Sequence, residues 1–97
     1  MKLYLVHCGF YDSIAGDGIY ELHTNLFVLA ESFEEAKEKA KLLPEFKSRK
    51  MHVDGMQEIV QVDGREITFG NKKTDQKTVI NSKRSSFARI PKPAVPQ

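Results

Sequence analysis

The chain has 97 residues, 40 % of them hydrophobic, a net charge of +2 and a single cysteine, Cys8. This length allows one domain with a modest core and leaves no room for a second catalytic domain, and one cysteine excludes an internal disulfide framework. The apolar run after Lys2 is shorter than a signal-peptide core or a membrane span. We therefore expect a cytoplasmic protein that makes no membrane contact.

Charge is distributed unevenly along the chain. Residues 1–70 hold eight Lys or Arg and twelve Asp or Glu, a net charge of −4, whereas residues 71–97 hold seven Lys or Arg and one acid, a net charge of +6. The second segment has three prolines and few large apolar side chains, so it buries too little surface to offset its ordering entropy. We predict a domain over 1–70 and a basic tail over 71–97, within which residues 78–80 could dock as an edge strand.

Two strands and a loop are predicted first. Apolar side chains occupy both faces of residues 2–8, as in an interior strand. Residues 9–19 are rich in Gly, Asp and Ser and form a long loop, of a length that is often functional. The alternation in residues 20–30 predicts a second strand with His23 on the face opposite Leu26.

A helix follows, with its start and its end marked in the sequence. Ser32 is a favourable N-cap, and Glu35 three residues later completes a capping box and is spaced to pair with Lys39. Pro44 ends the helix. The apolar stripe consists of Phe33, Ala36, Ala40 and Leu43.

The last elements are a short strand over residues 51–53 and a hairpin over residues 56–69. Asp63-Gly64 is a favoured two-residue type I′ turn, and it sets Val62 opposite Arg65. We expect one face of the hairpin to join the core; it carries Val60, Val62, Ile67 and Phe69. The order strand, strand, helix, strand, hairpin predicts an α+β fold, a small antiparallel sheet with one helix packed on it.

Several short stretches occur in a characteristic order and spacing over about residues 2–69. These are Lys2-Leu3-Tyr4-Leu5-Val6 with Gly9, Tyr11 and Asp12, Glu21-Leu22-His23, Phe27-Val28-Leu29-Ala30, Ala36-Lys37 with Ala40-Lys41, His52-Val53-Asp54 and Val62-Asp63-Gly64. In these stretches the chain resembles the bacterial family known as domain of unknown function 1543. Members carry two related halves, and this chain is similar to the second. The family brings no established activity.

This resemblance implies that one face of the domain lacks its usual partner. A second copy of the same chain is the simplest replacement, so we expect an isologous homodimer. A stable interface covers on the order of 600 to 800 Å² of each subunit.

Six residues are candidates for ligand binding. The three histidines, His7, His23 and His52, fall in or at the ends of predicted strands, and a metal or acid/base cluster needs two of them close together, with Glu21 or Asp54 orienting a ring. The structural alternative is that the histidines hydrogen-bond to backbone or carboxylates and stabilise the strand ends. The sixth candidate is Asp12, which with Asp17 and Glu21 could approach a hard cation, although the glycine-flanked segment lacks the ligand pattern of a calcium loop.

No catalytic motif is visible. Cys8 with a neighbouring histidine would be a nucleophile pair, but nothing marks it as a thiolate, and a buried structural cysteine is the alternative. There is no zinc-ligand cysteine spacing, phosphate-binding glycine motif or nucleophile elbow. The sequence therefore predicts neither a catalytic residue nor a cofactor.

The tail is the candidate nucleic-acid interface. Its basic side chains could contact phosphates, and such binding weakens with salt. The candidates are Lys72, Lys73, Lys77, Lys83, Arg84 and Arg89.

Three classes of function stay open. The first is a non-catalytic homodimeric module whose surface binds another macromolecule, for which a protein is one candidate. The second is a small-molecule or metal-dependent activity at the 9–19 loop with His23 and His52. The third is nucleic-acid binding through the tail.

Overall fold

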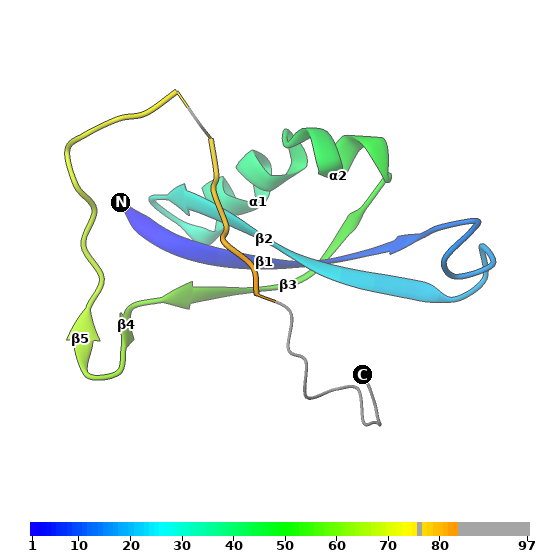
Figure 1. Ribbon diagram of the computed structural model, residues 1–97, viewed down its shortest axis with the longest axis horizontal. Coiled ribbons are helices and arrows are strands. Elements are labelled where there is room, and N and C mark those ends of the chain that lie inside the picture. Colours follow the sequence, from blue (N-terminus) through cyan, green and yellow to red (C-terminus); the bar gives the residue numbers. More distant parts are fainter. Residues whose placement is uncertain (76, 84–97) are drawn as a thin grey trace.

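A three-stranded antiparallel sheet organises the molecule, and the computed structural model describes residues 1–75 and 77–83 of it (Figure 1). β1 (Lys2–Tyr11) is the central strand. β2 (Glu21–Ala30) pairs with it on one side and β3 (His52–Ile59) on the other. The α+β class and the predicted order of elements are confirmed.

β1 is longer than predicted. The strand continues to Tyr11 because Phe10 keeps the alternating apolar pattern, is only 5 % exposed, and pairs with Leu22. The connection to β2 is therefore residues 12–20 instead of 9–19. Gly9, placed in the loop by its residue type, is a buried strand residue.

The cap of α1 (Phe33–Lys41) has the predicted residues. The Ser32 hydroxyl accepts a hydrogen bond from the Glu35 N–H at 3.1 Å, and the Glu35 carboxylate accepts one from the Glu31 N–H at 2.6 Å. Because Glu35 is used in this way, Lys39 does not pair with it. The Lys39 ammonium instead donates to the Leu29 carbonyl at 2.7 Å, which ties the helix to β2.

The helical layer covers one face of the sheet (Figure 1). Ala36 and Ala40 are fully buried, and their small size lets α1 approach the sheet closely. The first helix ends at Lys41, before the predicted stripe residue Leu43, and Pro44 opens a second helix, α2 (Pro44–Ser48), because proline is favoured at a first helical position. The buried core lies between these helices and the sheet and contains Tyr4, Val6, Cys8, Phe10, Leu26, Val28, Ala30, Ala36, Ala40, Phe46 and Met51.

The hairpin has the predicted turn and register. β4 (Gln61–Val62) pairs with β5 (Arg65–Glu66), with Val62 opposite Arg65, and both turn residues have positive φ, as a type I′ turn requires. Its assignment to the core is wrong, because Val60 and Val62 are 63 % and 58 % exposed. β3 runs on to Ile59 along β1, so the hairpin forms a separate sheet beyond its end.

The described part of the tail passes beside β2 (Figure 1). Residues 77–83 carry no strand, and docking of the tail stays a prediction. Arg84 and Arg89, two of the nucleic-acid candidates, lie outside the described residues. Among the helices of the described part, none has the length and apolar character needed to cross a membrane.

Candidate metal centre

The face of the sheet opposite the helices, which we call the open face, is covered by no helix of the described residues and changes character along its length. The tail approaches it, where Lys77 and Thr78 lie beside Phe27. Successive side chains of a strand point to opposite faces, so every second residue of each strand lies here. One end is apolar and carries Leu3, Leu5, Phe27, Leu29 and Ile59, all half-buried. The other end carries His7, Glu21, His23, Asn25, His52 and Asp54. Ionisable groups are thus concentrated at the end that joins the 12–20 loop.

Gly9 forms the floor of this polar end. It pairs with His23 on β2 and with His52 on β3, so the two histidines flank it at a backbone separation of about 9.5 Å, two strand spacings. A Cβ atom built on Gly9 would overlap Glu21 Oε2 and lie 2.5 Å from His52 Nε2 and 2.8 Å from Asp54 Oδ2. The missing side chain is therefore what lets these groups converge over the central strand.

A β-bulge in β3 positions Asp54. Val53 pairs with Cys8 and Gly55 pairs with His7, so Asp54 is an extra residue with no partner on β1. Bulges redirect a side chain and recur beside functional sites. Here the bulge turns the Asp54 carboxylate toward both histidines.

Two imidazole nitrogens face two carboxylates at the centre of the cluster. His23 Nε2 lies 3.2 Å from Asp54 Oδ2 and 3.5 Å from Glu21 Oε1. His52 Nε2 lies 3.1 Å from Asp54 Oδ1 and contacts Glu21 Oε2. These spacings are close to the edge of a tetrahedron with ligand bonds of 2.0 to 2.1 Å, about 3.3 Å.

The four side chains are accessible from outside. Their exposed fractions run from 31 % for Glu21 to 47 % for His52. Imidazole nitrogen combined with carboxylate oxygen is a donor set that suits zinc and its neighbours among the transition metals, whereas magnesium and calcium prefer oxygen alone. The donor atoms of Glu21, His52 and Asp54 lie within 4.8 Å of one another. This set of three, which we call the primary set, can hold one such ion and leave a coordination position open.

His7 lies beside this group on β1. Its Nδ1 is 2.8 Å from the Asn25 side-chain oxygen, and its ring stacks on that of His23, with centroids 5.0 Å apart and planes 7° from parallel. Five of the six predicted ligand candidates are therefore neighbours. Asn25 was not among the candidates, and only the strand register could have placed it opposite His7.

Asp12, the sixth candidate, is engaged within the loop. Its carboxylate accepts hydrogen bonds from the backbone N–H groups of Ile14 at 2.8 Å and Ala15 at 2.9 Å. These bonds lower the pKa of Asp12. The loop thus uses this carboxylate to order its own backbone.

Cys8 lies on the other face of β1. It is fully buried in the core, and burial, together with the charge of Asp54, raises the pKa of its thiol. A neutral, inaccessible thiol has the properties of a structural cysteine.

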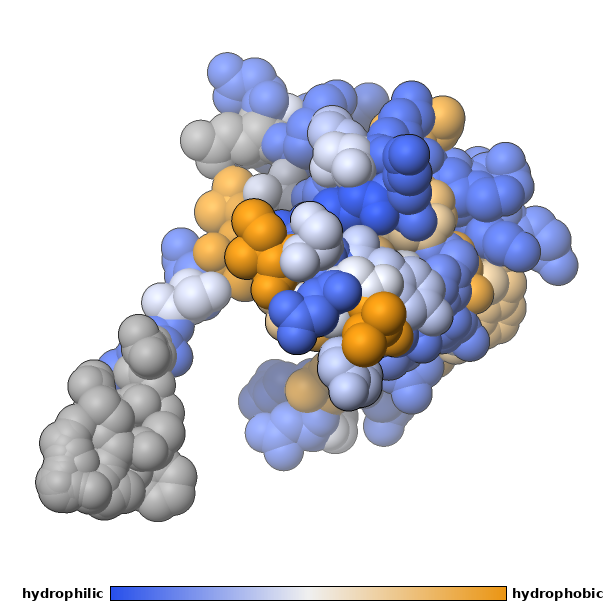
Figure 2. All heavy atoms as spheres, turned by 90° about the vertical axis from the view of Figure 1, so that its right-hand side faces the viewer, coloured by the Kyte–Doolittle hydropathy of each residue, from blue (hydrophilic) through white to orange (hydrophobic). Residues whose placement is uncertain are grey.

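The end of the molecule that carries the cluster has a mixed surface. Figure 2 faces this end and shows mostly hydrophilic side chains with separate hydrophobic ones among them. Tyr11 at the end of β1 and three loop residues, Ile14, Ile19 and Tyr20, contribute exposed apolar groups. The metal candidates therefore lie next to a loop that also offers apolar contacts.

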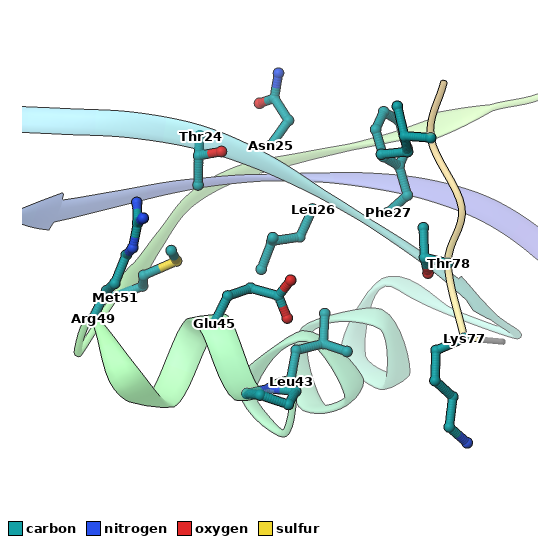
Figure 3. A pocket seen from close by; sticks show the side chains of 12 residues that line it. Thr24, Asn25, Leu26, Phe27, Leu43, Glu45, Arg49, Met51, Lys77 and Thr78 are labelled. Carbon is teal, nitrogen blue, oxygen red and sulfur yellow. The ribbon is translucent and has the colours of Figure 1, made fainter. Parts of the chain in front are cut away.

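A groove of about 640 Å³ reaches from Asn25 along β2 and lies between that strand, α2 and the tail (Figure 3). Leu26, Leu43 and Thr78 are among its lining residues, and the lining contains no histidine.

Four of the basic tail candidates, Lys72, Lys73, Lys77 and Lys83, are exposed. Nucleic-acid binding by the tail stays a prediction.

A family model for a Domain of Unknown Function (DUF1543) matches residues 18–69. The chain belongs to this family. All three residues of the primary set, and His23, lie inside the matched region, whereas His7 and Gly9 precede it. Searches of curated proteins and of solved structures found no match.

Proposed function

We propose that this protein binds a divalent metal ion of the zinc class through Glu21, His52 and Asp54. The observation that carries the proposal is the convergence of these donors over Gly9, where a side chain would fill the space between them. The strand register and the bulge at Asp54 both direct donors to this point. Two independent features of the backbone thus favour the same small volume.

Hydrogen bonding alone accounts less well for the arrangement. A neutral imidazole carries one N–H, and a hydrogen bond is strong only when it is close to linear. Nε2 of His52 faces an oxygen of Glu21 and an oxygen of Asp54, and Nε2 of His23 also faces both carboxylates. One proton on each nitrogen cannot serve two oxygens well, whereas a cation binds the nitrogen and both oxygens at once.

An ion with three protein ligands keeps a position for water or for a ligand group. Zinc in such a site lowers the pKa of its water to about 7 and polarises carbonyl or phosphoryl oxygens. The primary set is solvent-accessible, so a small molecule can reach that position. Metal-assisted hydrolysis is the reaction class that this chemistry serves best.

Zinc titration of tag-free, chelator-treated protein tests the proposal. We expect saturable binding with a Kd of about 1 μM or lower, and about 2.7 kcal/mol of added stability at free zinc 100-fold above Kd. Asp54→Asn should abolish binding. Asp63→Asn is the matched control, because Asn is favoured at the positive φ of that turn residue. A wild-type protein that binds no zinc, or an Asp54→Asn variant that binds it normally, would contradict the proposal.

A second candidate function is self-association through the apolar end of the open face. The supporting observation is that Leu5, Phe27 and Leu29 are only half-buried although they lie on the sheet itself. A second copy placed against this end would cover them, as expected for a chain that resembles one of two related halves.

Sedimentation velocity measures this association directly. We expect a dimer for the wild type and a monomer for Phe27→Glu, since a charge buried at an interface is costly. Ile14→Glu, at an exposed loop position, is the control and should stay dimeric. A monomeric wild type at high micromolar concentration would exclude this candidate.

A further inference from the structure

A second set of metal donors lies against the primary set. It consists of His7, His23 and Asp54, whose donor atoms also lie within 4.8 Å of one another. The two sets share Asp54. A carboxylate common to two ligand sets is the usual bridge between paired metal ions, which lie about 3.5 to 4 Å apart in two-metal sites.

The two oxygens of each carboxylate point to different histidines. Asp54 directs Oδ1 toward His52 and Oδ2 toward His23, and Glu21 directs Oε2 toward His52 and Oε1 toward His23. If a single ion were bound by both His23 and His52, each carboxylate would need to direct only one of its oxygens toward that ion. The paired orientation fits two ions, one beside each histidine.

His7 is held in a way that suits a ligand. A metal-binding histidine generally uses its other ring nitrogen to hydrogen-bond a fixed acceptor. The Asn25 oxygen, 2.8 Å from Nδ1, can serve as that acceptor, so that Nδ1–H donates and Nε2 keeps its lone pair. The His7 ring also stacks on the His23 ring with planes 7° from parallel, so one of the two rings must rotate out of the stack for both to direct a lone pair at the same ion.

We propose that the cluster is a two-ion centre. His52 binds the first ion together with Glu21 and Asp54, and His7 and His23 bind the second, with Asp54 bridging the pair. The inference rests on the proposed metal site and assigns His7 and Asn25 a part in it. Two divalent ions against two carboxylates leave positive charge on the centre, so the ligand that it takes should be anionic and rich in oxygen, such as a phosphate group.

Metal stoichiometry separates this inference from the proposed function. Tag-free full-length protein is loaded with Mn²⁺, and its metal content is measured by native mass spectrometry and its spin coupling by electron paramagnetic resonance. We expect two ions in each chain and an exchange-coupled spectrum. A single uncoupled Mn²⁺ ion, or no bound Mn²⁺, would overturn the two-ion centre. The primary site is judged by the zinc titration, because Mn²⁺ binds such donors more weakly than zinc.

Variants assign the second ion to its ligands. His7→Ala should keep one ion and lose the coupling, and His7→Gln is the substitute if the alanine variant does not fold. Asn25→Ala should lower the affinity for the second ion by about 10- to 100-fold, as is usual when the hydrogen-bond partner of a ligating histidine is removed. Two ions retained by both His7 variants would contradict the assignment. Gln57→Ala, on the same face of β3, is the control and should keep two coupled ions.

Discussion

Cys8 and His7 are neighbours on β1, yet Cys8 is fully buried under the helices and His7 lies on the open face. The same contrast runs along the strand. Tyr4, Val6 and Phe10 are at most 5 % exposed, while Leu3 and Leu5 on the other face are half-buried. One central strand therefore carries the core on one face and the candidate chemistry on the other. Substitutions at adjacent positions should affect stability and metal binding separately.

The largest effect on stability is expected at the covered face. Tyr4 is 1 % exposed and packs edge-to-face on Phe33, with ring centroids 5.0 Å apart. Tyr4→Ala should cost about 3 to 5 kcal/mol of unfolding free energy, as for other large aromatic truncations. In the monomer, where no second copy covers it, Leu5→Ala on the open face should cost less than about 2 kcal/mol. Urea unfolding followed by circular dichroism measures both, and equal losses would mean that the open face is covered in solution.

Among residues that supply no ligand atom, the largest effect on metal binding is expected at Gly9. In Gly9→Ala the new methyl group would displace Glu21, His52 and Asp54, so zinc affinity should fall by at least about 100-fold, the upper end of the effects seen for outer-shell changes. Gly55→Ala is the matched control, since no atom lies within 4 Å of a Cβ placed there. Competition with a chromophoric chelator gives both affinities. Similar zinc affinities in the two variants would show that the missing side chain at Gly9 is not required for metal binding.

Cys8 gives a chemical test of the same contrast. Because burial raises its thiol pKa, the folded protein should react with iodoacetamide far more slowly than the urea-unfolded chain at pH 8. The folded state favours the neutral Cys8 thiol. The contribution of this thiol to the free energy of unfolding is therefore fully present below the thiol pKa of the unfolded chain, and it is lost as pH rises through the thiol pKa of the folded protein. Rapid alkylation of the native protein would show that β1 opens readily.

The smallest effect is expected at Asp12, outside both faces. Its pKa is lowered by backbone hydrogen bonds, so its contribution to loop stability is present above the unfolded pKa of the carboxyl and is lost as pH falls through the folded pKa. Asp12→Ala should accelerate amide exchange at Ile14 and Ala15 at neutral pH and leave zinc affinity unchanged. Asp12→Asn keeps an acceptor oxygen, so its amide exchange rates at Ile14 and Ala15 should lie between those of the wild type and those of Asp12→Ala. A loss of zinc binding in Asp12→Ala would place this residue in the centre after all.

Local signals predicted the elements well. The Ser32 cap and the Asp63-Gly64 turn depend on a few adjacent residues, and both formed as expected. The exposed hairpin valines were misplaced because alternation defines which side chains share a face but not whether another layer covers it. The longer β3 took the position beside β1 and left Val60 and Val62 beyond the sheet.

The candidate site was predictable as a list of residues and not as a geometry. His23 and His52 are 29 positions apart, and they converge because both pair with Gly9. That pairing is a tertiary property, and so is the bulge that turns Asp54. Gly9 resembled a loop glycine in the sequence because its residue type does not show whether a glycine serves a turn or makes room for its neighbours.

The contact between Glu21 and His52 has a consequence for the motions of the sheet. β2 and β3 are the two outer strands and share no backbone pairing, so this contact joins them directly across β1. At the opposite end β3 finishes beside Leu3 and leads into the exposed hairpin. Strand separation should therefore begin near Ile59 and reach His52 last, and amide protons along β3 should exchange progressively more slowly toward the histidine.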